Sequence, residues 1–153
     1  MNPDILMFFD RKPAALPLYE KFENRVLEEI KDVHVKVQKT QITFSNRHGF
    51  AFVSFLPVRK AKDRPEPYLT ATFGLSHRMD SPRIDAAVEP YPNRWTHHVM
   101  IGEPEEIDEE LMAWVAEAAE FAAVKQKVRE KETAGIRKLP GAGNGKTEET
   151  ERS

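Results

Sequence analysis

The stretch VHVKVQKTQITFSNRHGFAFVSFL, Val33 to Leu56, decides the fold class. Its three leading valines alternate with polar residues, which predicts a β-strand with one buried face. Ile42 and Phe44 are apolar at the opposite parity, so the register must shift across Lys39–Gln41 by a bulge or a bend. A turn signal, SNRHG, follows. The segment Phe50–Leu56 is apolar at nearly every position, which is typical of a central strand covered on both faces.

The flanking sequence predicts three more strands and two helices. Strand patterns cover 69–75, 84–88 and 95–101, and hairpin-length loops between them imply an antiparallel meander. An amphipathic helix is predicted from about Ala14 to Ile30, with Pro17 in its first turn. A second helix begins after Asp108, which suits an N-cap. We therefore expect one α+β domain over residues 1–130, in which an antiparallel meander sheet of about five strands is packed by an N-terminal and a C-terminal helix. Residues 131–153 are expected to form a disordered polar tail.

The composition fits a soluble globular domain, with 40% hydrophobic and 31% charged residues in a chain of 153. No apolar run is long enough to cross a bilayer, and the N-terminus lacks the pattern of a secretion signal. The chain contains no cysteine, which excludes disulfides, thiolate zinc sites and a cysteine nucleophile. These features are compatible with a cytoplasmic protein that has no membrane partner.

The net charge of -2 is distributed unevenly along the chain. The segment from His34 to His98 contains ten Lys/Arg and five Asp/Glu residues, a balance of +5 that leaves -7 for the remainder. All five histidines lie in this basic segment. Ordinary surface charge explains the asymmetry as well as a surface that attracts an anion does, and both interpretations stay open.

The stretch NRWTHHVMIG, Asn93 to Gly102, contains two adjacent histidines. Neighbouring side chains on a regular strand point to opposite faces, so His97 and His98 do not both bind one ion. His97 shares the parity of Trp95 and is expected on the apolar side, whereas His98 faces a cleft or solvent. A metal site would need another histidine to fold back beside them, and we expect no metal and no cofactor.

Charged residues near strand ends form a candidate binding surface. Lys39 and Gln41 lie where the strand pattern breaks, so either a bulge turns them to solvent or they line a polar pocket at the sheet's end. Planar guanidiniums suit carboxylate or phosphate recognition, although ordinary surface charge accounts for each single arginine equally well. The candidate binding residues are Lys39, Gln41, Arg47, Arg83, Arg94, Trp95 and His98.

Several short motifs are excluded by their spacing. GAGNGKT near the C-terminus resembles a phosphate-binding loop, but Pro140 occupies the position of the required first glycine. We find no nucleophile elbow, no HExxH motif and no nucleic-acid-binding fingerprint.

Three longer segments carry a family resemblance: FFDRKPAALPLYEKFENRV, VKVQKTQITFSNRHGFAFVSF and NRWTHHVMIGEPEEIDEELMAWVAEAA. With these segments the chain resembles, from about Leu6 to Val124, an uncharacterised bacterial family, domain of unknown function 5655. The resemblance implies a compact α+β module. It implies no established activity, cofactor or catalytic residue.

Three functional hypotheses follow from the residues. The first is a non-enzymatic binding module whose basic strand-end surface recognises an anionic ligand, a nucleic acid or an acidic protein surface. The second is a small enzyme in which His98 acts as general acid or base, while Lys39, Arg47 or Arg94 stabilises developing negative charge. The third is a module that forms a homodimer through its sheet or helix faces.

Overall fold

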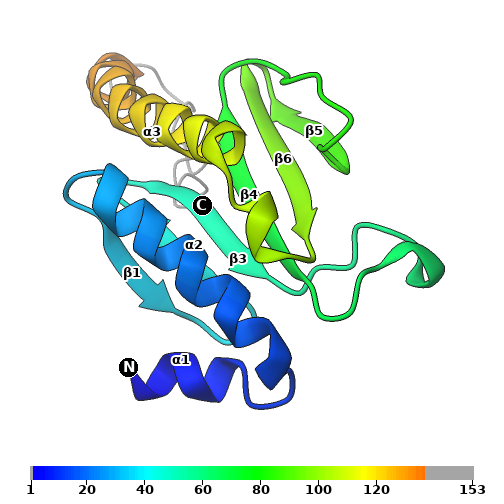
Figure 1. Cartoon of the computed structure of the whole chain (residues 1–153). Helices are drawn as coiled ribbons and strands as arrows, with labels where there is room; N and C mark the ends of the chain where they lie inside the picture. The colour runs from blue at the N-terminus through cyan, green and yellow to red at the C-terminus, as the bar shows by residue number, and fades with distance from the viewer. Residues whose placement is uncertain (1, 137–153) are drawn as a thin grey trace.

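A six-stranded, fully antiparallel sheet forms the centre of this computed structural model, which describes residues 2–136 and the side chains of 2–124 (Figure 1). The spatial order of the strands is β1-β2-β3-β4-β6-β5. Their bounds are β1 His34–Val37, β2 Ile42–Ser45, β3 Gly49–Ser54, β4 Leu69–Leu75, β5 Ala86–Tyr91 and β6 Arg94–Ile101. The predicted α+β class and antiparallel sheet are confirmed, with six strands where about five were expected.

Helices precede and follow the sheet. They are α1 Pro3–Phe8, α2 Leu16–Glu29 and α3 Glu109–Ile136, with short 3-10 turns η1 Pro13–Ala15, η2 Ala61–Asp63 and η3 Pro104–Glu106. Pro17 lies in the first turn of α2 as predicted. Asp108 is the N-cap of α3, because its Oδ1 accepts a hydrogen bond from the Leu111 N–H at 3.1 Å. Helix α1 was not predicted from the sequence, although an Asn2 cap and Pro3 mark its start.

The additional strand arises at KTQ, where the predicted bulge or bend is wrong. Residues 38–41 form the loop of a hairpin, and the Gln38 N–H donates to the Gln41 carbonyl at 2.8 Å. Val37 pairs with Ile42 and Val35 with Phe44. Paired residues of an antiparallel ladder share a face, so odd positions in β1 lie beside even positions in β2. The change of parity therefore follows from a turn with an even number of residues.

The predicted meander holds only from β1 to β4. The chain then crosses to the far edge of the sheet, forms β5, and returns as β6 between β5 and β4. Two contacts join the crossing loop, 76–85, to α3 and its N-cap: His77 Nε2 lies 2.6 Å from Glu117 on α3, and Arg83 Nη1 lies 2.9 Å from Asp108. These contacts hold the loop against the start and middle of α3.

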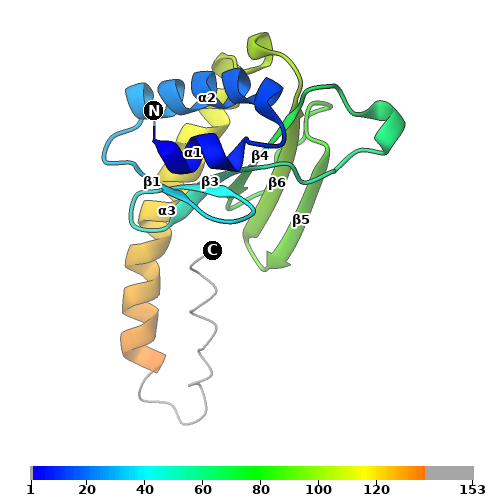
Figure 2. The same ribbon diagram turned by 90° about the horizontal axis from the view of Figure 1, so that it is seen from below.

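Helices α2 and α3 cover one face of the sheet (Figure 1). The row Val37, Ile42, Val53, Ala71 and Val99 runs across five paired strands and faces these helices. The prediction that Phe50–Leu56 is covered on both faces is wrong, since Phe52, Ser54 and Phe55 are only partly buried. Figure 2 shows β5 and β6 turned steeply relative to the β1–β3 part of the sheet. The strong twist gives the uncovered face its hollow shape.

The C-terminal helix extends beyond the expected domain boundary at residue 130. Its last residue is Ile136, and the segment KQKVREKETAGI is composed mainly of residues with good helix propensity. The rest of the predicted tail, 137–153, lies outside the described residues. In the part of the chain that the structure describes, no helix combines the length and apolar character needed to cross a membrane.

Candidate functional site

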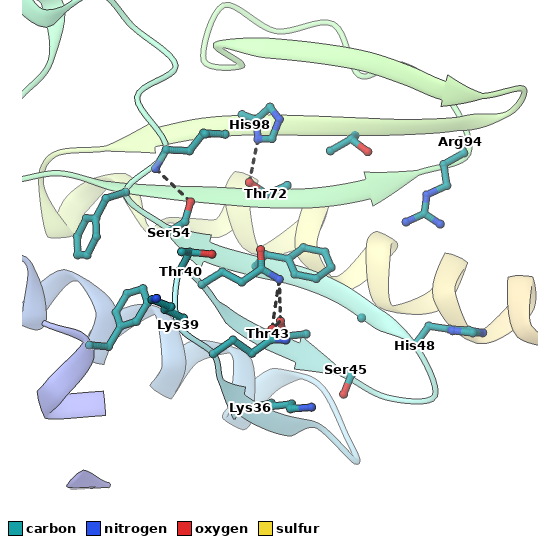
Figure 3. Close-up of a pocket in the computed structure, with 18 of the residues that line it drawn as sticks. Lys36, Lys39, Thr40, Thr43, Ser45, His48, Ser54, Thr72, Arg94 and His98 are labelled. Carbon is teal, nitrogen blue, oxygen red and sulfur yellow. Dashed lines mark hydrogen bonds between the residues drawn. The ribbon is translucent and has the colours of Figure 1, made fainter. Parts of the chain in front are cut away.

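The uncovered face of the sheet is hollowed into a groove with a volume of about 970 Å³ (Figure 3). Side chains from β1, β2, β3, β4 and β6 form its floor, and the β1–β2 loop and Phe8 of α1 form part of its wall. The nineteen lining residues are Phe8, Lys36, Gln38, Lys39, Thr40, Gln41, Thr43, Ser45, Arg47, His48, Gly49, Phe52, Ser54, Phe55, Leu56, Thr72, Arg94, Thr96 and His98. We call this site the sheet groove.

The centre of the sheet groove is one continuous cross-strand row. Its members are paired from strand to strand in the order Lys36, Thr43, Phe52, Thr72, His98. Directly opposed residues point to the same side of an antiparallel sheet. The row therefore presents one cation, two hydroxyls, an aromatic ring and an imidazole side by side, although its first and last members are 62 positions apart in the sequence.

One end of the groove is formed by the β2–β3 turn and the start of β6. Figure 3 places His48 and Arg94 together at this end, and Arg47 precedes His48 in the turn. Arg94 extends over Gly74, where an added Cβ would lie 3.8 Å from Arg94 Nη2. Asn46 fixes the turn: its Oδ1 accepts from the Arg47 N–H at 2.6 Å, and its Nδ2 donates to the Ala119 carbonyl on α3 at 2.9 Å. We call this region the arginine end.

The opposite end combines one lysine with apolar side chains. Lys39 and Thr40 of the hairpin loop lie beside Ser54 there (Figure 3). The Phe8 and Phe55 rings stack on each other with centroids 5.5 Å apart. The Tyr68 hydroxyl donates to the Phe55 carbonyl at 2.8 Å and positions that strand end.

The polar side chains between the two ends are oriented by their neighbours. His98 Nδ1 lies 2.8 Å from Thr72 Oγ1, which fixes the orientation of the ring. Burial lowers the pKa of His98, so the imidazole is largely neutral at pH 7. The Thr43 hydroxyl donates to Gln38 Oε1 at 2.6 Å and accepts from Gln41 Nε2 at 3.1 Å. These contacts hold the two amide side chains at the groove wall.

The electrostatic character of the sheet groove differs from that of the chain. Acidic residues outnumber basic ones in the sequence, 25 to 23. None of the nineteen lining residues is Asp or Glu, whereas four are Lys or Arg and two are His. Six more carry a hydroxyl group. Such a lining favours a ligand that is negatively charged and accepts hydrogen bonds.

Five of the seven residues singled out in the sequence line this groove, namely Lys39, Gln41, Arg47, Arg94 and His98. Arg83 does not. Its Nη1 contacts Asp108 at 2.9 Å and Glu110 at 3.0 Å, and its guanidinium lies over the Trp114 ring, 5.8 Å from the centroid. These acidic partners at the start of α3 neutralise Arg83 on the helix-covered side.

Trp95 also lies outside the groove, because its parity differs from that of Arg94 and His98. Arg78 lies over its ring at 5.9 Å. His97 has the same parity as Trp95 and lies on the apolar side, as expected, although it is fully buried where a half-buried histidine was predicted. The Met79 N–H donates to its Nε2 at 2.9 Å, and its ring stacks on Phe73. Burial lowers its pKa. The structure therefore separates the histidine pair onto two faces of the sheet.

Lys36, Phe52 and Thr72 line the groove but were not among the candidate binding residues predicted from the sequence. A signal for them existed in the alternation of β4, where threonines occupy the parity opposite to the apolar residues. Extending that parity to the neighbouring strands requires the register of each pair, which the sequence alone did not supply. Among residues 2–124, whose side chains the structure describes, no three His, Asp or Glu side chains lie close enough together to hold a metal ion.

The fold and groove define an α+β domain with helices on one face of its sheet and a basic groove on the other. The chain belongs to the family described as a domain of unknown function (DUF5655), whose family model matches residues 7–122. The matched segment includes every strand and all nineteen residues that line the groove. Phe8 lies at the margin of this segment, and the other lining residues lie well inside it. No curated protein and no solved structure matches the chain.

Proposed function

We propose that this domain is a non-enzymatic binding module whose sheet groove takes up a small anion carrying a carboxylate or phosphate group. The observation that carries the proposal is the composition of the lining, which has four Lys or Arg side chains, six hydroxyls and no carboxylate. A groove of about 970 Å³ is also within the size range of small-molecule sites.

Each kind of side chain has a distinct role in this proposal. Arg47 and Arg94 offer planar pairs of N–H donors for bidentate contacts with the anionic group. Lys36 and Lys39 add point charges. Hydroxyls of the lining other than that of Thr43, whose proton is donated to Gln38, supply further hydrogen bonds. His98 supplies a pH-dependent donor, because an anion bound beside the ring favours its charged form.

Sulfate is a suitable first probe, because its charge does not change near neutral pH. We expect isothermal titration calorimetry to detect sulfate binding that weakens as sodium chloride rises. Arg94→Ala should weaken it roughly tenfold, as the loss of a charge-assisted hydrogen bond predicts. Lys62→Ala is the matched control, since it removes an exposed cation from η2, outside the groove. Equal effects of the two variants, or binding that is insensitive to salt, would overturn the proposal.

A small enzyme is the second candidate function, and the Thr72–His98 contact favours it. With Nδ1 fixed at 2.8 Å from the Thr72 hydroxyl, Nε2 is the ring atom left for proton transfer to a ligand in the groove. Lys39, Arg47 or Arg94 would then stabilise developing negative charge. An enzyme of this kind should lose turnover of phosphate esters on His98→Gln substitution while retaining sulfate affinity. A screen that finds no turnover by the unsubstituted protein would leave the binding module as the better account.

A further inference from the structure

The aromatic ring at the centre of the sheet groove indicates a more specific ligand. We infer that the ligand carries a planar ring system that stacks on Phe52, with its anionic group at the arginine end. This inference rests on the proposed anion-binding function. A mononucleotide has this chemistry. The inference adds the ligand's second part to the anionic group already proposed.

Phe52 is the side chain that core packing does not explain. It is half-buried on the uncovered face of a central strand, where its cross-strand partners are Thr43 and Thr72. Part of its surface therefore stays exposed in the free protein, and burying that part would add to the binding energy of a ligand. A flat ligand would bury the ring face, while the hydroxyls on either side would meet polar atoms at the ligand's edge.

The neighbouring glycine makes room for the orientation of this ring. A Cβ added at Gly49 would lie 2.9 Å from Phe52 Cζ and 3.0 Å from Cε2. The ring therefore leans along the strand against the Gly49 backbone. In this orientation the phenyl group can offer a face, and not only its tip, to a molecule in the groove.

The Phe52 ring lies next to the arginine end of the groove. Its edge reaches the Gly49 backbone, and Gly49 directly follows His48 of the β2–β3 turn. A planar ring stacked on Phe52 therefore needs only a short linker, such as a sugar, to place its anionic group at the arginine end. Gln38 and Gln41 add amide groups at the groove wall, and amides pair well with the donors and acceptors on a base edge.

Two other ligand types fit the groove less well. A hydrocarbon chain over Phe52 would offer no polar partner to the four Lys and Arg side chains of the lining. A single-stranded nucleic acid uses successive aromatic platforms. Phe52 is the one aromatic residue in the cross-strand row, and the Phe8 and Phe55 rings are stacked on each other.

The test compares two phosphate esters that differ in the ring system. We expect AMP to bind at least roughly tenfold more tightly than ribose 5-phosphate in calorimetric titrations, as the loss of one base–aromatic stack predicts. Phe52→Leu should remove most of this preference and leave ribose 5-phosphate binding unchanged. Phe52→Tyr keeps the ring and should keep the preference. Tyr91→Leu on β5 is the control, because it removes an aromatic ring from an exposed site outside the groove.

The outcomes separate this inference from the function on which it rests. If neither ester nor sulfate binds, the anion-binding proposal itself fails. If both esters bind equally, or Phe52→Leu weakens both by the same factor, anion binding stands and the ring inference is overturned. If an oligonucleotide binds far more tightly than AMP, the ligand is a nucleic acid and the mononucleotide inference is overturned. Circular dichroism of each variant checks that it is folded. If Phe52→Leu does not fold, Phe52→Tyr still tests the inference, because a tyrosine variant that loses the preference for AMP would contradict it.

Discussion

Two glycines near the ends of neighbouring central strands have very different surroundings. An added Cβ at Gly102 would lie 2.5 Å from Pro65 Cβ and 2.7 Å from its Cγ, both in a rigid ring. At Gly74 the nearest atom is the end of the flexible Arg94 side chain, 3.8 Å away. The same substitution therefore tests overpacking at one position and ordinary contact at the other.

We predict that Gly102→Ala lowers the free energy of unfolding by about 1–3 kcal/mol, because Pro65 and the loop that carries it must move. Gly74→Ala should change it by less than about 0.5 kcal/mol. Urea unfolding of both variants at pH 7 measures the difference. Equal losses at the two positions would show that the close approach of Gly102 to Pro65 does not control the effect.

Single residues also show what the sequence could predict about the site. The alternating parity of β6 placed His97 on the apolar side and His98 on the other face, and the structure agrees. Arg83 was selected for its position near a strand end, and nothing in the sequence indicated its partners Asp108 and Glu110 at the start of a distant helix. Phe52 was expected to be covered because Phe50–Leu56 is apolar at nearly every position, and only the sheet's uncovered face distinguishes it from Phe44.

At the scale of elements, the start of α3 combines a helix cap with an ion pair. Asp108 Oδ1 accepts from the Leu111 N–H at 3.1 Å, and Arg83 Nη1 lies 2.9 Å from the same oxygen. Burial alone would raise the pKa of Asp108, but hydrogen bonds from Leu111 and Arg83 lower it overall. The carboxylate thus joins the loop after β4 to the helix that covers β3 and β4.

Asp108→Ala should lower the free energy of unfolding by about 1–2 kcal/mol, because it removes the N-cap and leaves Arg83 with one carboxylate partner fewer. Asp108→Asn is the matched control. Asparagine is an equally good N-cap, so this variant should lose less than about 1 kcal/mol. Urea unfolding at pH 7 ranks the two, and an asparagine variant as unstable as the alanine variant would mean that the ion pair outweighs the cap.

The elements were predicted where their pattern is local and missed where it depends on pairing. Both long helices follow from apolar spacing and from residues at their ends, such as Pro17 and Asp108. The hairpin at 38–41 was interpreted as a bulge, since a change of parity within one strand and a turn between two strands give the same apolar pattern. The exchange of β5 and β6 left no local signal, because it depends on where the loop 76–85 is anchored.

At the scale of the whole molecule, one sheet separates two environments. Its helix-covered face contains the apolar row through Ile42 and Val53, and its other face contains the row through Thr43 and Phe52. A shift of one residue in any pairing would exchange the two rows. The register that buries the core therefore also assembles the groove, which explains why residues far apart in the sequence meet there.

The burial and the partners of three histidines control how stability depends on pH. Burial lowers the pKa of His97 and of His98 in the folded protein, so below about pH 6.5 the unfolded chain binds more protons at these positions than the folded one. Their contribution to stability falls as the pH is lowered. His77 has the opposite sign: its hydrogen bond to Glu117 raises its pKa, and that contribution is lost as the pH rises through the raised value. His77 is about half exposed, so solvent screens its effect.

We therefore predict that the free energy of unfolding falls as the pH is lowered from about 7 to about 5.5, since two buried histidines outweigh one exposed pair. His98→Gln should flatten this fall, because glutamine keeps a polar contact with Thr72 but does not titrate. His77→Gln should steepen it, because the stabilising partner of Glu117 is lost at low pH. Urea unfolding curves for the three proteins across this range measure both changes. If the two variants shift the slope in the same direction, the assignment of opposite signs to His77 and His98 is wrong.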